Sequence, residues 1–260
     1  ILEWTTPAGR SKTPQCIEML VQLESEGVIQ LPKLQVQNRH NKKKSSELKI
    51  SKPNEDIAGN VKEYGTITLD IARVGEDLNR WRAYVNQYHM LGDKRVFGSR
   101  LHYFIRSGER ELGCLQFSAS AWALAERDRW IGWNVEDRKK RLHLIVNNSR
   151  YLIFPWVKIK NLASKALSLA IRQIQSDWLH EYCYAPVLLE TFVDLKHFKG
   201  TCYKAANWIN LGETKGRGRM DRQKEYALSR KAIFMYPLQK DFKECLRGEK
   251  PYKAVNPDEQ

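Results

Sequence analysis

Residues 161–194 read NLASKALSLAIRQIQSDWLHEYCYAPVLLETFVD, the longest helical pattern of the chain followed by its strongest strand pattern. Apolar side chains recur with helical period from Leu162 to Tyr182, and Asn161 occupies the position of a helix-capping residue. The segment from Pro186 to Asp194 is rich in β-branched and aromatic residues and has no breaker inside it, which predicts a buried strand. A long helix beside a buried strand indicates a sheet covered by helices.

Patterns on either side of this stretch predict further helices and strands. A turn at residues 107–109 joins two apolar runs and predicts a β-hairpin. The predicted helices are 78–88, 119–129, 135–146 with Asn134 as its cap, and 201–209; the predicted strands are 101–106, 112–117, 151–154 and 232–236. This order predicts an α+β protein whose mixed sheet is covered by helices.

The N-terminal region predicts a small basic module. Residues 15–29 have helical spacing and then turn at Gly27, which fits either a winged-helix fragment or an amphipathic helix packed on the main body. Residues 39–52 have six Lys or Arg against one Glu and predict a basic linker. We therefore expect a module and linker over 1–53 and a core domain over 54–260. The linker residues expected to contact phosphates are Arg39, Lys42, Lys43 and Lys44.

The charge balance predicts a polyanionic partner. Lys and Arg number 44 against 30 Asp and Glu, a formal net charge of +14. Nucleic acid is the first expectation and an anionic membrane surface the second. The five cysteines are odd in number and lack C-x-x-C spacing, and no run approaches the ~20 apolar residues of a membrane span. We therefore predict a cytoplasmic protein without a disulfide framework or zinc ribbon, and the start at Ile1 predicts further sequence upstream.

The run Phe198-Lys-Gly-Thr-Cys-Tyr-Lys-Ala-Ala-Asn-Trp208, with Gly212, Thr214 and Gly216-Arg-Gly-Arg219, resembles the Druantia protein A family. The resemblance covers about 101–238, and residues 27–32 also fit the family's N-terminal part. It implies DNA-related work in a transposon-like element or an anti-phage defence locus.

Carboxylates near this run predict a metal site for phosphodiester cleavage. Glu190 and Asp194 share one face of the predicted strand, but their Cα atoms are roughly 13 Å apart in an extended chain. One of them, joined by Asp128 or Asp221, would hold Mg²⁺ and activate a water or hydroxyl nucleophile. In the structural alternative, Glu190 pairs with a basic neighbour and Asp194 caps the turn at Lys196.

Tyr203 gives a second catalytic hypothesis. It stands with Cys202 at the start of a predicted helix, where backbone N–H groups and the helix dipole favour an anion. A tyrosine nucleophile there would attack DNA with His197 or Lys199 assisting. The alternative is that Tyr203 packs in the core.

A glycine-punctuated basic loop is the segment most strongly expected to contact nucleic acid, because guanidinium and backbone groups can approach phosphates there. The predicted nucleic-acid contacts of this region are Lys199, Lys204, Lys215, Arg217, Arg219 and Arg222. Four tryptophans could stack on unpaired bases or pack in the core: Trp130, Trp133, Trp156 and Trp208.

The predicted element order also resembles the acyl-coenzyme A N-acyltransferase fold, in which the strand before the long helix splays to admit the cofactor. The loop that opens the helix is glycine-rich in that fold, whereas residues 157–163 have no glycine; Lys158 and Lys160 could still meet a phosphate. The first prediction is therefore a DNA-processing nuclease or transposase with Mg²⁺. A DNA-binding subunit without catalysis is the second, and an acyltransferase is the third.

Overall fold

The computed structural model describes residues 13–30, 48, 50–53, 55–94, 98–216 and 229–251. The chain divides into two compact units, Ile1–Ser46 and Glu47–Gln260. In the first unit the described element is helix α1 (Thr13–Ser25), which ends in a turn where Gly27 has φ +73°. The second part of the predicted winged-helix fragment, residues 31 and 32, lies outside the described residues.

A seven-stranded sheet in the order β2-β3-β4-β5-β7-β9-β8 forms the centre of the second unit. Its strands are β2 (Ile67–Ile71), β3 (Arg100–Ser107), β4 (Arg110–Ala119), β5 (Ile145–Ile153), β7 (Leu188–Asp194), β8 (Ile209–Glu213) and β9 (Lys231–Pro237). The neighbours β5 and β7 run parallel and the other neighbours antiparallel. A small parallel sheet pairs β1 (Ile57–Asn60) with β6 (Val157–Lys160).

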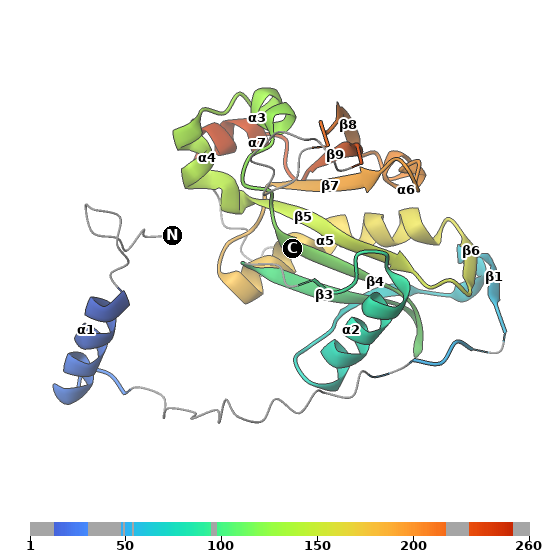
Figure 1. The fold of residues 1–260 in the computed structure, drawn as a ribbon, viewed down its shortest axis with the longest axis horizontal. Coiled ribbons are helices and arrows are strands. Elements are labelled where there is room, and N and C mark those ends of the chain that lie inside the picture. Colours follow the sequence, from blue (N-terminus) through green and yellow to red (C-terminus); the bar gives the residue numbers. More distant parts are fainter. Residues whose placement is uncertain are drawn as a thin grey trace. The chain divides into compact units, whose positions relative to one another are not determined.

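Helices cover both faces of the large sheet (Figure 1). They are α2 (Glu76–Tyr88), α3 (Ala125–Ile131), α4 (Val135–Arg141), α5 (Leu162–Tyr182), α6 (Thr201–Ala205) and α7 (Phe242–Arg247), with 3-10 turns at Val61–Tyr64 and Leu142–Leu144. On α2, Trp81 contacts His102 of β3 with ring centroids 4.5 Å apart, whereas Asp177 of α5 accepts a hydrogen bond from Tyr103. Because adjacent strand residues point to opposite faces, α2 and α5 lie on opposite faces of the sheet.

Helix α3 lies on the α2 face, at the other end of the sheet. Its Arg127 bonds Glu190 of β7, which is in register with Asn147 and, one strand further, with Ser118 on the α2 face. A second apolar cluster forms there under α3 and α7 and includes Ile131 and Met235. The sheet thus has α2, α3, α4 and α7 on one face and α5 and α6 on the other.

The parallel pair of β5 and β7 is short. Only Ile145–Asn147 pairs with Leu188–Glu190, although β5 has nine residues and β7 seven. The two strands therefore separate toward their carboxyl ends. Helix α5 provides the long crossover that parallel neighbours require.

The α+β fold class with an acyltransferase-like core is confirmed, and so are the hairpin, the long helix and the strands before and after it. Three predicted helices are too long. Helix α4 ends at Arg141 and β5 begins at Ile145, because residues 145–153 pair with β4 and buried residues alternate with half-buried ones from Val146 onward. Likewise β4 continues to Ala119 and α3 begins only at Ala125, and α6 ends at Ala205, before strand β8. Within the described residues, no helix combines the length and hydrophobicity needed to cross a bilayer.

Candidate functional site

Three buried side chains close the gap between β5 and β7 on the α5 face. Thr191 of β7 donates a hydrogen bond to the Asn148 carbonyl of β5 (3.0 Å), and the Tyr203 hydroxyl of α6 donates to Asn148 Oδ1 (2.6 Å). Burial raises the pKa of Tyr203 well above its ordinary value, so the phenol stays protonated and remains a donor. Side chains thus bridge the strands directly beyond the last backbone pair.

Close packing of α6 on β9 places Tyr203 at this gap. Gly200 opens the helix with φ +66°, and a Cβ there would lie 2.8 Å from the Phe234 ring. The absence of a side chain lets α6 approach the sheet, and Tyr203 stacks on Phe234 with ring centroids 5.7 Å apart. The Phe198–Trp208 run therefore supplies the α6 side of this contact.

A cavity of about 490 Å³ lies between the N-terminal half of α5 and the end of α6, and Tyr236 of β9 also lines it. None of its lining residues is acidic. The polar lining consists of Asn161, Ser164, Lys165, Ser168, Arg172 and Asn207. Two cations and the N-terminal turn of a 21-residue helix favour a phosphate here, because the N–H groups of the first turn point out of the helix end.

Glu190 forms a buried ion pair on the opposite face. Its Oε2 accepts from Arg127 Nη1 at 2.9 Å and its Oε1 from the Ala121 backbone N–H at 2.7 Å, and both charged side chains are fully buried. Burial raises the pKa of Glu190, while Arg127 and the Ala121 amide oppose that rise. Asp128 contacts the same guanidinium at 2.9 Å and also accepts from Arg138 at 2.7 Å. Glu190 and Asp128 are thus brought together, but through Arg127.

Asp194 caps the turn after β7. Its Oδ1 accepts from the Lys196 backbone N–H at 3.1 Å, and its Oδ2 lies 3.2 Å from His197 Nδ1. Pairing of β7 with β9 is unbroken from Leu188 to Asp194, so no bulge brings Asp194 toward Glu190. The observed contacts are those of the structural alternative, in which Glu190 pairs with a basic residue and Asp194 caps the turn at Lys196.

The prediction of Mg²⁺ is therefore wrong for the part of the chain that the structure describes. No group of three or more His, Cys, Asp or Glu side chains there could hold a metal ion. Glu190, predicted as a ligand, is neutralised by Arg127, and Asp194 is engaged in its turn. Asp221 lies outside the described residues.

The predicted nucleic-acid residues are only partly described. Lys199 and Lys204 are exposed at α6, and Lys215 is exposed after β8. The others, Arg39, Lys42, Lys43, Lys44, Arg217, Arg219 and Arg222, lie outside the described residues. Trp156 and Trp208 are buried, Trp130 packs on Phe242, and Trp133 donates to the Leu246 carbonyl, so these rings belong to the core. The predicted phosphate contact Lys158 instead pairs with Asp56 at 2.5 Å.

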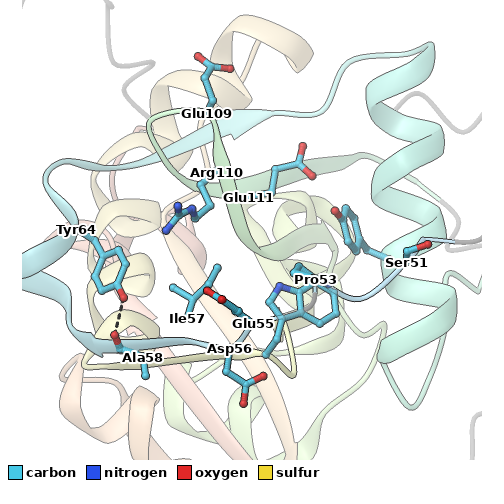
Figure 2. Close-up of a pocket in the computed structure, with 12 residues that line it drawn as sticks. Ser51, Pro53, Glu55, Asp56, Ile57, Ala58, Tyr64, Glu109, Arg110 and Glu111 are labelled. Carbon is cyan, nitrogen blue, oxygen red and sulfur yellow. Dashed lines mark hydrogen bonds between the residues drawn. The ribbon is translucent and has the colours of Figure 1, made fainter.

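A cavity of about 690 Å³ that the sequence did not indicate lies beside β1 and the β3–β4 turn (Figure 2). Its walls combine carboxylates with aromatic rings: Glu55, Asp56, Glu109, Glu111, Tyr64, Tyr84 and Trp156. Glu111 pairs with Arg80 and Arg106, and Asp56 pairs with Lys52 and Lys158. These two carboxylates are already compensated, and of the residues singled out in the sequence this cavity is lined by Trp156, a candidate for base stacking.

The fold places the protein in the class of α+β proteins with an N-acyltransferase-like core. Similar solved structures include FeeM, an N-acyl amino acid synthase from uncultured soil microbes (12% identity, 66% of this chain and 90% of that chain, TM-score 0.39). Aminoglycoside acetyltransferase AAC(6')-Ib in complex with coenzyme A is similar at 12% identity (66% and 95%, TM-score 0.41). A variant of spermidine N-acetyltransferase SpeG from Vibrio cholerae is similar at 9% identity (69% and 95%, TM-score 0.43).

The chain belongs to the Druantia protein DruA family, whose model matches residues 22–227. This match confirms the resemblance carried by the Phe198–Trp208 run. No curated protein matches the chain in sequence.

These findings correct the predicted function. The prediction of metal-assisted DNA cleavage or transposition is wrong for the described residues: the expected metal ligands are an ion pair and a turn cap, and no group of side chains there could hold a metal ion.

Proposed function

We propose that this protein is an acyl-coenzyme A-dependent N-acyltransferase of a Druantia anti-phage defence system. The observation that carries the proposal is the basic cavity between α5 and α6, two helices that cover a sheet whose parallel strands β5 and β7 separate after three paired residues. An open strand pair beside a phosphate-compatible helix terminus suits a long ligand with phosphates at one end.

The lining residues fit the phosphate end of coenzyme A. Lys165 and Arg172 supply positive charge, and Ser164 and Ser168 supply hydroxyl groups on the same helix. Coenzyme A, when bound, supplies an acyl group as a thioester that an amine can accept. A cofactor arm that extended between β5 and β7 would meet Tyr203, whose hydroxyl donates to Asn148 in this gap. We therefore expect the arm to enter only when Tyr203 leaves this position.

Titration with coenzyme A and acetyl-coenzyme A tests the proposal. A ligand that binds only the native state at about 100 times its Kd stabilises it by about 2.7 kcal/mol, a clear rise in Tm. The double substitution Lys165→Ala with Arg172→Ala should weaken binding at least tenfold. Lys139→Ala, on α4 at the other face, is the matched control and should bind normally. Absence of a saturable Tm rise with either ligand would refute the proposal.

Activity is measured as thiol release from acetyl-coenzyme A with spermidine or an aminoglycoside as trial amines. Tyr203→Phe removes the bond to Asn148 while keeping the ring on Phe234. It should raise affinity for coenzyme A several-fold without changing affinity for the 3′-phospho-ADP fragment, which lacks the arm. If Tyr203→Phe changes the affinity for coenzyme A and for the fragment equally, the arm does not enter between the strands.

We also propose DNA as a partner, supported by the net charge of +14 and by the exposed lysines at α6. Neutralising Lys215, Arg217, Arg219 and Arg222 together should weaken DNA binding. It should also reduce the slope of log affinity against log salt concentration by up to about four, one for each phosphate that these side chains no longer neutralise. Affinity measured across a salt series checks this, and an unchanged slope would remove the loop from the interface.

A further inference from the structure

A strip of polar side chains crosses the α2 face at the centre of the sheet. His102, Gln116 and Arg150 are in register across β3, β4 and β5. The next row on the same face contains Ser118 and Asn147. The strip lies between α2, whose Trp81 contacts His102, and α3, which pairs with Glu190 beside Asn147. Polar groups therefore occupy positions where the core of a sheet is ordinarily apolar.

Several atoms of this strip have no hydrogen-bond partner among the residues that the structure describes. Gln116 is 0% exposed, and both its Nε2 and its Oε1 lack partners. His102 Nε2, in a residue only 6% exposed, and Asn147 Oδ1 also lack partners. A buried group left unpaired costs about 1–3 kcal/mol, whereas an apolar side chain of similar shape avoids that cost. So many unpartnered buried polar atoms in one place indicate that something other than the protein bonds to them.

The charges around the strip favour an anion. Arg150 is 7% exposed, and within the described part of the chain it donates to two carbonyl oxygens, those of Gly92 at 2.7 Å and Ser149 at 2.6 Å. Asp93 pairs with Arg82 at 3.3 Å, and it is also the carboxylate that favours the charged form of Arg150. Two guanidinium groups thus share one carboxylate. By contrast, Glu190 and Asp128 balance Arg127 and Arg138 nearby.

His102 contributes a neutral ring to this positive surrounding. Burial, together with Arg100 and Arg82, lowers its pKa to about 4. Near neutral pH its unpartnered Nε2 can donate or accept a hydrogen bond, depending on the tautomer, and the ring adds no charge. Asn147 and Ser149 are partly exposed, so the strip reaches the surface.

We infer that this strip binds a small ligand bearing an oxyanion, a carboxylate or a phosphate, with Arg150 facing the charge and Gln116 bonding its polar edge. The inference goes beyond acyl transfer and does not depend on it, because the strip lies on the opposite face of the sheet from the α5–α6 cavity.

Thermal shifts of the full chain with sodium acetate and sodium phosphate, each against sodium chloride at equal ionic strength, test the inference. We expect a saturable rise in Tm with one of the two anions, and which anion acts identifies the ligand's charged group. Gln116→Leu should fold with an unchanged or higher Tm, because it removes both unpartnered atoms, and it should weaken the response at least tenfold.

The double substitution Lys165→Ala with Arg172→Ala separates this site from the α5–α6 cavity. The response should survive it; a response that disappears there and persists in Gln116→Leu overturns the inference. No saturable response in the unmodified protein also overturns it, since water alone would then satisfy the strip. If Gln116→Leu does not fold, the side-chain amide NMR signals of Gln116 in the unmodified protein decide: they shift with the active anion, or the inference fails.

Discussion

At the residue scale, a carboxylate in a strand gives no sign in the sequence of whether it is catalytic or paired. Glu190 stands four positions before Asp194, which suggested an acidic site, but its partner Arg127 is 63 residues away in the chain. The sequence allows a basic partner for Glu190 but does not identify it. The partner became known only from the approach of α3 to β7.

Glu190→Gln should destabilise the protein by about 3–5 kcal/mol, because it removes the fully buried one of the two carboxylates that neutralise the buried Arg127. Urea denaturation followed by circular dichroism measures this loss. Asp194→Asn, at the turn after β7, should change stability far less, since its contacts are near the surface.

The double substitution Arg127→Met with Glu190→Met is the matched control for this ion pair. It should recover much of the stability, because apolar side chains of similar volume replace both charges. If the single and double variants are equally unstable, packing rather than charge pairing explains the loss.

At the element scale, the sequence predicted the long helix and both hairpin strands, where local periodicity and burial agree. Prediction failed where the same apolar residues fit both the helical period and a strand. The apolar residues Leu142, Ile145 and Val146 fit a helix, yet Ile145 and Val146 belong to β5 because β4 and β7 are there to pair with them. Strands β1, β6 and β8 are short and carry no pattern of their own, so only their pairing partners define them.

The two predicted helix caps differ in a way that can be measured. The Asn134 side chain accepts from the Asp137 backbone N–H at 2.8 Å, as a cap should, whereas Asn161 makes no side-chain cap bond and adopts φ +65°. Asn134→Ala should therefore cost about 1 kcal/mol. Asn161→Gly should cost nothing or stabilise, since glycine favours that conformation. Thermal unfolding of the two variants checks both, and equal losses would contradict this assignment.

At the scale of the whole molecule, the sequence predicted the fold class because the order of helices and strands alone limits the possible sheets. It did not predict either proposed ligand site. The polar strip combines residues of three strands, and the α5–α6 cavity combines a helix start with the turn after another helix. Such juxtapositions depend on long-range pairing and register, which local pattern does not contain.

The same long-range packing predicts how overall stability depends on pH. The pKa values of His89 and His102 are lowered to about 4 from 6.5, chiefly by burial, and burial lowers that of His143 as well. Between pH 6.5 and about 4 the unfolded chain therefore binds more protons than the native state, so the free energy of unfolding falls as the solution is acidified. Each such histidine contributes a slope of about 1.4 kcal/mol per pH unit inside that window. Urea denaturation at closely spaced pH values measures the slope. The substitution His102→Asn should reduce the slope by about 1.4 kcal/mol per pH unit, the contribution of one proton. An unchanged slope would show that His102 is protonated in the native protein.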